Sequence, residues 1–384
     1  MFPAPRAEAV VDLRAVRDNV AHLRAFVQGR ELMAVVKADG YGHGIAESAA
    51  AARVGGASWL GVATLDEALA LRAAGDTGSI LCWLTVPGED YAPALAAGIE
   101  VTASSTDQLA AMLLPARDLG QVVSVQLKAD TGLSRGGATA AQWRALVDAA
   151  RRAELAGVAE VTGVWSHLAC GDEPEHPSVD RQLEAFGRAV AAAEAAGLRP
   201  RLRHLANSAT LLTRPDAWFD LVRPGLAVYG LSPIPQVASA AELGLTPAMT
   251  LRASLSLVKQ VAAGQGVSYG HTHVTRADTT LGLVPLGYAD GIPRHASGRG
   301  PVQVAGVRRQ VAGRVCMDQF VVDLAGAEAG PGDEVVIFGP GSTGEPTAQD
   351  WADAADTISY EIVSRLGGRI RRRFVGADDI GLAR

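Results

Sequence analysis

The 384-residue chain is poor in cysteine, and this scarcity argues against two kinds of site. Its three cysteines, Cys82, Cys170 and Cys316, are widely separated and odd in number. None belongs to a Cys-x-x-Cys pair, so neither a zinc cage nor a disulfide framework is indicated. Because disulfides are rare in reducing compartments, this cysteine usage favours a cytoplasmic protein.

Long apolar runs and an excess of basic charge are also missing. Ala-rich stretches are interrupted by Arg, Glu or Asp well before the roughly 20 residues that a membrane-spanning helix needs. Residues 1–11 lack the charged and apolar regions of a secretory signal, so we expect none. The formal net charge is −6, and the basic cluster at residues 369–373 is typical of a solvated helix or strand end. We therefore expect neither a membrane nor a nucleic-acid partner.

The pattern of apolar residues changes once along the chain. With 48% hydrophobic and 20% charged residues, the composition is that of a globular protein with more than one domain. From about residue 8 to residue 230, short β-branched runs alternate with stretches of helical period. Strands are predicted to end near Lys37, Ala63, Trp83, Ala103, Lys128, Trp165, Leu205 and Val222. Helices are predicted over residues 65–74, 105–114, 140–153 and 179–195, two of them opened by the capping boxes Thr64-x-x-Glu67 and Ser105-x-x-Gln108.

Eight strand–helix units favour an α/β fold, a (β/α)8 barrel of the TIM type. A doubly wound open sheet is the main structural rival. It is disfavoured because no Gly-x-Gly-x-x-Gly follows the first strand, and because polar groups follow many strands instead of gathering at one switch point. After Pro247, short strands punctuated by Gly, Pro and Asp predict a second, mostly β domain. Its strands are expected at residues 253–261, 279–284, 302–304, 319–324 and 334–338, and its helices at 347–355 and 359–366. We predict a barrel domain over residues 1–240 and a β-rich domain over residues 241–384.

Lys37 is the first residue that suggests chemistry. It stands at the end of an apolar strand and is followed by a glycine-rich turn. A lysine at the mouth of a barrel can lose its hydration, which lowers its pKa toward the value that a Schiff-base amine needs. The glycines let the backbone approach a ligand, and Tyr41 could donate to a phosphate. Spacing alone instead favours an ordinary strand-end lysine with its head in water.

Polar groups after the other predicted strands favour the functional interpretation of Lys37 over the ordinary one. They are Lys128 with Arg135, His167, Ser208 and Arg223. Each could be structural alone, but such groups at the C-terminal ends of several barrel strands indicate a site. Ser208 and the backbone N–H groups near Gly225 and Leu226 could cradle a phosphate, as loops after the last two barrel strands often do.

Taken in order, these motifs resemble the alanine racemases. The resemblance rests on nine windows at residues 35–44, 127–135, 166–167, 206–208, 222–230, 267–270, 287–291, 314–319 and 357–361, and it spans nearly the whole chain. Departures are slight. Asp39 and Gly40 follow the lysine where other members often have Asn-Ala, and Ser134 stands where Gly is common. Neither departure removes a functional side chain.

The resemblance implies a pyridoxal-5′-phosphate enzyme that interconverts L- and D-alanine and supplies D-alanine for peptidoglycan. It implies a head-to-tail homodimer in which the β-rich domain of one subunit completes the site of the other. Lys37 would bind the cofactor and act on one face of the substrate, and Tyr269 of the second subunit would act on the other face. The residues implied for the cofactor phosphate are Tyr41, Ser208, Gly225, Leu226 and Tyr360.

The remaining implied roles concern the ring and the substrate. Arg223 would face the pyridine nitrogen, Arg135 and Met317 of the second subunit would contact the substrate, and Lys128 would be carbamylated beside Arg135. Lys128 could equally be unmodified and face solvent or Asp130. A carbamate would turn this lysine into an anion that can orient Arg135.

Chemistry considered from the residues agrees with these roles. A racemase takes a proton from one face and returns it to the other, so two bases are economical. Free tyrosine has a pKa of about 10, so Tyr269 needs a relay, and His167 backed by Arg223 is the obvious one. Arg223 would leave the pyridine nitrogen unprotonated, which favours quick reprotonation over side reactions. Taken alone, Tyr269 is better interpreted as a strand-end tyrosine packed on Gly270, and it is the lysine partner and the family resemblance that reverse this preference.

Competing interpretations stay open at this point. His271 and His273 form a His-x-His pair, but no carboxylate or cysteine lies at a supporting spacing, so we expect no metal. Decarboxylases of ornithine, arginine or diaminopimelate share the predicted architecture but pair the pyridine nitrogen with a carboxylate. A broad-specificity racemase is a second rival, which the size of the pocket would decide. A non-catalytic cofactor carrier on a similar barrel lacks a second domain, so the region that carries Tyr269 argues against it. A barrel without cofactor would need Lys37, Tyr41, Ser208 and Arg223 to coincide by chance.

Overall fold

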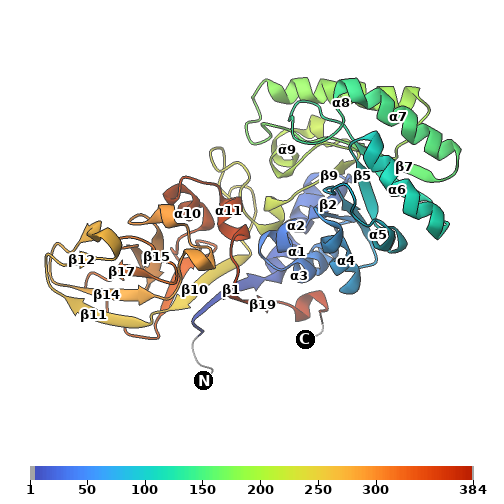
Figure 1. Ribbon diagram of the computed structural model, residues 1–384. Helices are drawn as coiled ribbons and strands as arrows, with labels where there is room; N and C mark the ends of the chain where they lie inside the picture. Colours follow the sequence, from blue (N-terminus) through green and yellow to red (C-terminus); the bar gives the residue numbers. More distant parts are fainter. Residues whose placement is uncertain (1–4, 383–384) are drawn as a thin grey trace.

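A computed structural model describes residues 5–382 of the chain. Residues 1–4 and 383–384 lie outside the described part. The first four belong to residues 1–11, where we expect no secretory signal. Figure 1 shows an elongated molecule with an α/β barrel at one end and a β-rich part at the other. No helix within residues 5–382 is long and apolar enough to cross a membrane.

The barrel is built from eight parallel strands. They are β2 (Glu31–Val35), β3 (Trp59–Val62), β4 (Ser79–Cys82), β5 (Glu100–Ala103), β6 (Val123–Lys128), β7 (Ala159–Trp165), β8 (Leu202–His204) and β9 (Leu221–Val222). Their order is β8-β7-β6-β5-β4-β3-β2-β9, and the backbone hydrogen bond from Asp220 N to Arg203 O, 3.0 Å long, helps to join β8 to β9. Every predicted strand end lies at or just beyond an observed strand. The barrel prediction is confirmed, and the open sheet is wrong.

Helices cover the barrel from outside (Figure 1). They are α1 (Leu13–Phe26), α3 (Ile45–Val54), α4 (Leu65–Ala73), α5 (Ala92–Ala96), α6 (Thr106–Leu119), α7 (Ala140–Leu155), α8 (Ser178–Ala195) and α9 (Ser208–Thr213). The capping box of Thr64 and Glu67 is present, but that of Ser105 and Gln108 is half formed, since Gln108 Oε1 accepts from Ser104 N instead. Helix α6 continues five residues beyond its predicted end, through Pro115, because it still buries Ala116.

The β-rich part contains three sheets. The largest has the order β16-β15-β18-β10-β1-β19, the second is β11-β14-β17, and the third pairs β12 with β13. The strands are β1 (Ala7–Asp12), β10 (Met249–Ser254), β11 (Leu257–Val261), β12 (Gly266–Val267), β13 (His273–Val274), β14 (Thr279–Val284), β15 (Pro301–Val304), β16 (Val307–Gln310), β17 (Phe320–Asp323), β18 (Glu334–Phe338) and β19 (Arg371–Val375). Two helices, α10 (Ala348–Ala354) and α11 (Ser359–Ser364), complete it.

One predicted strand of this part is wrong in its extent. Residues 253–261 form the end of β10 and all of β11, which belong to different sheets. The chain changes sheet between them because Leu255 N donates to Asp333 O, whereas Ser256 N donates to Leu283 O. Apolar residues continue through the switch, so hydrophobicity alone does not reveal it.

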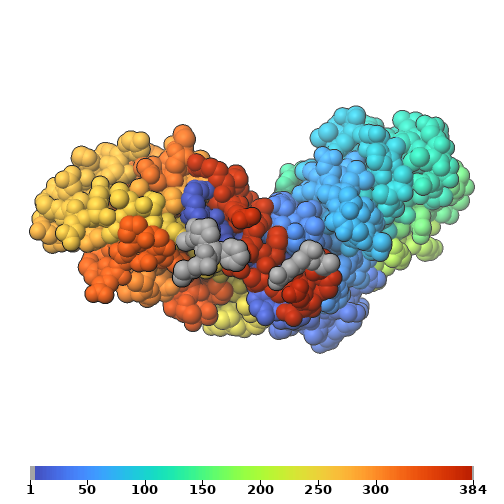
Figure 2. Space-filling model, turned by 90° about the horizontal axis from the view of Figure 1, so that it is seen from below, coloured from blue at the N-terminus to red at the C-terminus, as the bar shows by residue number. Residues whose placement is uncertain are grey.

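The first strand of the chain also departs from the sequence prediction. The sequence pattern places residues from about 8 onward in the barrel alternation, but β1 pairs with β10 antiparallel and with β19 parallel. Figures 1 and 2 show this blue strand beside the red C-terminal segment, where the two parts of the molecule meet. Asp12 ends β1 and caps α1 by accepting from Arg14 N at 2.9 Å. The chain therefore passes directly from the β-rich sheet into the barrel.

Candidate active site

The turn after the first barrel strand has an unusual backbone. The short segment α2 (Lys37–Tyr41) contains Ala38, Asp39 and Tyr41 with φ of 53°, 53° and 52°. Each non-glycine residue in this left-handed region costs about 1–2 kcal/mol, so surrounding contacts must hold the turn. One of them is from Ala38 N to Glu67 Oε1 at 2.6 Å. The turn thereby fixes the positions of Lys37 and Tyr41 at the barrel mouth.

The amine of Lys37 is in an environment that disfavours its charge. Burial lowers the pKa of Lys37, and the charge of Arg135 lowers it further, while Glu67 opposes both. A larger fraction of neutral amine results near neutral pH, which is the form that reacts with a carbonyl. The strand-end lysine is therefore not an ordinary solvated one.

Ser208, Gly225 and Tyr41 converge on one point. Ser208 Oγ accepts from Gly225 N at 2.8 Å and from Ala227 N at 3.4 Å. A Cβ at position 225 would lie 2.3 Å from Tyr41 Oη, so only glycine allows this approach. Leu226 begins the 3-10 helix η2 (Leu226–Tyr229), and the first N–H groups of a helical turn lack a partner within it. Hydroxyls and N–H groups gathered in this way form an anion cradle, which we call the phosphate cradle.

Tyr41, which belongs to the phosphate cradle, packs against two other tyrosines. The ring of Tyr41 stacks on Tyr229 at 5.0 Å between centroids and lies 6.1 Å from Tyr360, which α11 supplies. Tyr229 Oη donates to Val35 O in β2. Burial raises the pKa of Tyr41, and it raises that of Tyr360 to about 12. Both hydroxyls therefore stay protonated and available as donors.

Arg223 is a buried cation that organises the barrel interior. Its Nη1 donates to His204 Nδ1 at 2.9 Å, and its Nη2 donates to Ser166 O at 2.8 Å, Leu205 O at 3.1 Å and His167 Nδ1 at 3.3 Å. A guanidinium cannot accept, so both Nδ1 atoms are acceptors and both histidines carry their proton on Nε2. Burial, followed by the charge of Arg223, lowers the pKa of both histidines well below its ordinary value.

A buried polar chain continues from His204 across the barrel. His204 Nε2 donates to Gln126 Oε1 at 2.7 Å, and Gln126 Nε2 donates to Glu100 Oε2 at 2.9 Å. Glu100 also accepts from Thr162 and pairs with Arg201. The amide of Gln126 therefore presents its oxygen to His204, which agrees with the tautomer that Arg223 imposes.

Lys128 lies beside this chain. Its Nζ is 4.3 Å from the centroid of the Trp165 ring, and the guanidinium carbon of Arg223 is 4.9 Å from the same ring. Burial lowers the pKa of Lys128 to about 8, and the charges of Arg223 and Arg135 act in the same direction. Ser134 has φ of 57°, a backbone conformation that favours glycine.

Two predicted site residues stay apart from the others within one chain. Tyr269 is 70% exposed and Met317 is 53% exposed. Tyr269 follows β12, which Figure 1 shows at the outer end of the β-rich part, away from the barrel. The structure thus brings together Lys37, Tyr41, Lys128, Arg135, His167, Ser208, Arg223, Gly225, Leu226 and Tyr360, but not Tyr269 and Met317.

Comparisons with known proteins agree over the full length. Two family models match: the alanine racemase N-terminal domain over residues 11–233, and the alanine racemase C-terminal domain over residues 248–374. The alanine racemase of Streptomyces coelicolor is 57% identical over 375 residues, which are 96% of each chain. The chain belongs to the alanine racemase family. It is a pyridoxal-phosphate-dependent isomerase that interconverts L- and D-alanine.

Solved alanine racemases share the same fold. The structure from the D-cycloserine-producing Streptomyces lavendulae has a TM-score of 0.97 and 56% identity, over 98% of this chain and 99% of that one. The Bartonella henselae alanine racemase, solved with covalently bound pyridoxal phosphate, has a TM-score of 0.85 and 29% identity, over 97% of this chain and 100% of that one.

The residues of this alanine racemase fit the cofactor of the family. The phosphate cradle offers the hydroxyls of Ser208 and Tyr41, and a side chain at position 225 would collide with the Tyr41 hydroxyl. Lys37 supplies an amine with a lowered pKa, and Arg223 supplies a buried hydrogen-bond donor in the barrel interior. No group of three or more His, Cys, Asp or Glu side chains within residues 5–382 could hold a metal.

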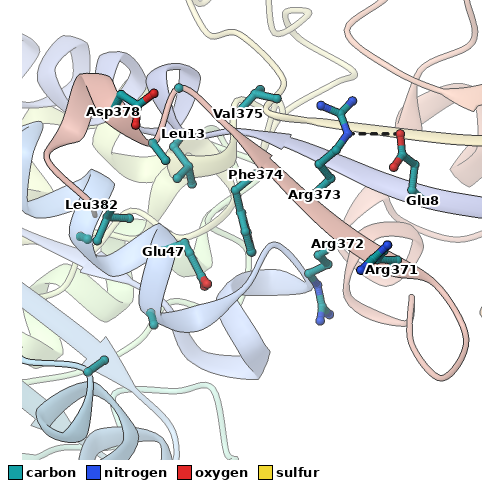
Figure 3. A pocket seen from close by; sticks show the side chains of 15 residues that line it. Glu8, Leu13, Glu47, Arg371, Arg372, Arg373, Phe374, Val375, Asp378 and Leu382 are labelled. Atoms are coloured by element: carbon teal, nitrogen blue, oxygen red, sulfur yellow. Dashed lines mark hydrogen bonds and ion pairs between the residues drawn. The ribbon is translucent and has the colours of Figure 1, made fainter. Parts of the chain in front are cut away.

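A cavity of about 790 Å³ lies along β19 and α3 (Figure 3), and no residue of the phosphate cradle lines it. Its walls come mainly from β19 and from α3, the helix that follows the turn, and they include Glu47, Arg371, Arg372 and Phe374. Asp290, which belongs to the window at residues 287–291, is buried and paired with Arg6 and Arg369.

Several residues that shape the site carry no clear signal in the sequence. The spacing predicts Glu67 only as a helix cap, yet its second oxygen reaches Ala38 N. Gln126 and Glu100 lie within strands that read as ordinary barrel strands, and no motif singles them out. Polar residues at inward positions of otherwise apolar strands are the one signal that could have found them.

Proposed function

We propose that this alanine racemase uses two bases, Lys37 and the Tyr269 of a second subunit, in a head-to-tail homodimer. One observation carries the proposal. Lys37 shares its turn at the barrel mouth with Tyr41, whereas Tyr269 is 70% exposed in a separate part of its own chain. In a closed two-fold dimer, one exposed residue can complete the partner's site, and the symmetry then completes both sites.

The first base acts at Lys37 Nζ. When bound, pyridoxal phosphate withdraws the electrons left on the substrate Cα as its proton departs. The lowered pKa of Lys37 lets its amine accept that proton near neutral pH and return it afterwards. The left-handed turn keeps Nζ on one face of the bound substrate, so a second group is needed for the other face.

The second base acts at Tyr269 Oη. A tyrosine accepts a proton readily only when its phenolate is stabilised. His167 is neutral and, because Arg223 donates to its Nδ1, carries a proton on Nε2. That Nε2–H would donate to the Tyr269 oxygen of the second subunit and stabilise its phenolate form.

Arg223 controls the cofactor ring in this proposal. Its Nη1 donates to His204 and its Nη2 to His167 and two carbonyls, whereas its Nε has no hydrogen-bond partner within residues 5–382 and would be the donor for the pyridine nitrogen. Burial lowers the pKa of Arg223 to about 9, which still leaves it protonated at neutral pH. An arginine that keeps its proton favours quick reprotonation of Cα, whereas the rival decarboxylases would need a carboxylate there.

The remaining residues hold the phosphate and the substrate. Tyr41, Ser208, Gly225, Leu226 and Tyr360 would bind the phosphate. Arg135 and the Met317 of the second subunit would contact the substrate. A carbamate on Lys128 would replace the repulsion between this lysine and Arg135 with an attractive pair. We further propose a cytoplasmic enzyme, in keeping with three free cysteines, that supplies D-alanine for peptidoglycan.

Absorbance and solvent deuterium together test the two bases. Purified protein should show the visible band of lysine-bound cofactor and should convert L-alanine in deuterated water into D-alanine that carries deuterium at Cα. Lys37→Ala should lose both the band and the conversion. Tyr269→Phe should keep the band but lose most conversion. A Tyr269→Phe variant with wild-type turnover would overturn the second base.

A further inference from the structure

The left-handed turn at Lys37–Tyr41 is held by contacts from the barrel and by contacts from the β-rich part, and the second set has no assigned role. We propose that Arg372 is a positioning residue, which fixes the turn carrying Lys37 and Tyr41 from strand β19 of the β-rich part. The inference rests on the proposed cofactor roles of Lys37 and Tyr41. It adds to them a connection between the two parts of the molecule.

Two contacts of Arg372 reach the turn. Arg372 Nε donates to Gly42 O at 2.7 Å, and Arg372 Nη2 lies 2.8 Å from Asp39 Oδ2. The other oxygen of Asp39 accepts from Ile45 N at 3.0 Å, at the start of α3. Asp39 therefore joins Arg372 to the first turn of the helix that follows. This ion pair depends on the carboxylate of Asp39.

The opposite side of the turn is held by the barrel itself. Glu67 accepts from Ala38 N, and His43 Nδ1 lies 3.0 Å from both Gly40 O and Tyr41 O. Within residues 5–382, Arg372 is the one residue of the β-rich part that makes a hydrogen bond or an ion pair to the turn. Because β19 pairs with β1, which runs directly into α1, Arg372 stands on a rigid support.

The expected effect is on the geometry of the turn, not on overall stability. The Arg372 and Asp39 side chains are 29% and 49% exposed, and ion pairs of this kind contribute little to folding. A left-handed turn of non-glycine residues, however, reverts to commoner backbone angles when its contacts are removed. Lys37 and Tyr41 would then move away from the cofactor.

Arg372 also lines the 790 Å³ cavity. Figure 3 shows it pointing away from the ion pair of Arg373 and Glu8, on the other side of the strand. A small cation in solution can therefore reach the space that a shortened side chain would leave. The neighbouring Arg371 lines the same cavity, is exposed, and makes no side-chain hydrogen bond or ion pair among the described residues. It is the matched control.

The test follows release of the cofactor from holoenzyme. Wild type, Arg372→Ala and Arg371→Ala are diluted into cofactor-free buffer, and the loss of the visible band is timed. Arg372→Ala should release the cofactor about tenfold faster or more, since small displacements in a site have effects of this size. Millimolar guanidinium should slow its release again. Arg371→Ala should match wild type with and without guanidinium.

Two further measurements separate positioning from folding and from the proposed function. Hydrogen exchange of residues 38–44 should be faster in Arg372→Ala, while the thermal unfolding temperature stays near that of wild type. Wild-type release by Arg372→Ala overturns the inference, as does faster release with a lower unfolding temperature and no response to guanidinium. If Tyr41→Phe and Lys37→Ala also hold the cofactor as wild type does, the proposed cofactor roles fail instead.

Discussion

At the scale of single residues, the site depends on which basic groups carry charge. Arg223 is buried yet still protonated at neutral pH, and its charge acts on three neighbouring basic groups. It lowers the pKa of Lys128, His167 and His204, in each case after the larger effect of burial. Burial and this permanent cation together favour the neutral forms of these neighbours, which are the forms in which an amine reacts and an imidazole accepts from Arg223.

Lys128 should react with carbon dioxide. Only the neutral amine forms a carbamate, and a pKa of about 8 makes a substantial fraction neutral at physiological pH. Protein equilibrated with ¹³C-labelled bicarbonate should give a carbamate signal in ¹³C NMR that increases from pH 7 to pH 9. The signal should be absent from Lys128→Met, which keeps the length of the side chain. A signal that persists in this variant would assign the carbamate to another amine.

Buried histidines should make stability depend on pH below neutrality. Burial lowers the pKa of His43 to about 4, and the pKa values of His167 and His204 are also lowered. The unfolded chain, with histidine pKa near 6.5, therefore binds more protons between about pH 6.5 and pH 4, and the free energy of unfolding falls as pH falls through this window. Each histidine contributes up to about 1.4 kcal/mol per pH unit.

The histidine contribution can be isolated with His43→Phe. Urea unfolding of the apoprotein between pH 5 and pH 6.5 should show a smaller slope of stability against pH in this variant, by about one proton. Between pH 7.5 and pH 8.5 the two slopes should coincide, because histidine is neutral in both states there. Parallel slopes below pH 6.5 would mean that His43 is protonated in the folded chain.

At the scale of elements, local patterns predict the barrel, and long-range pairing escapes them. Most barrel strands are short, mainly apolar runs, and several are followed by a polar group, so their ends are visible in the sequence alone. Strand β1 is different, since its partners β10 and β19 are more than 200 residues away and only the folded chain brings them together. The left-handed turn is invisible in the sequence for the same reason, because Glu67 and Arg372, which hold it, are distant along the chain.

The phosphate cradle should tolerate no side chain at position 225. In Gly225→Ala the new Cβ would lie 2.3 Å from Tyr41 Oη, and Tyr41 is packed against Tyr229 and Tyr360. The hydroxyl would be pushed out of the cradle, so cofactor affinity should fall by about tenfold or more. Titration of the apoprotein with pyridoxal phosphate measures this loss. An unchanged affinity would show that Tyr41 does not bind the phosphate.

Gly187, within the regular helix α8, provides a control for the Gly225→Ala variant. It lies on the exposed face of α8, and a Cβ there would meet no atom within 4 Å. Gly187→Ala should stabilise the chain by about 0.5–1 kcal/mol, since glycine loses more backbone freedom than alanine on folding. Thermal unfolding measures this gain, and cofactor affinity should not change. A loss of stability would mean that α8 is not a regular helix at this position.

At the scale of the whole molecule, the site is divided between the two ends of an elongated chain. The cofactor residues of the barrel meet Tyr360 and Arg372 from the β-rich part where the two parts join, and β1 and β19 hold that junction. Tyr269 and Met317 remain exposed elsewhere. The sequence motifs predict all of these residues except Arg372, but they cannot indicate which of them meet within one chain, because that depends on the arrangement of the two parts.

Tyr269 could serve the site of the partner subunit or the site of its own chain. A heterodimer with one variant in each subunit separates these two possibilities. Subunits carrying Lys37→Ala and Tyr269→Phe are given different tags, co-expressed and purified together. If Tyr269 serves the partner's site, one of the two sites in this heterodimer combines an intact Lys37 with an intact Tyr269, while the other site lacks both. The heterodimer should then have about half of the wild-type activity per dimer, although each homodimeric variant is inactive. If Tyr269 acts within its own chain, each site carries one defect and the heterodimer is as inactive as its parents.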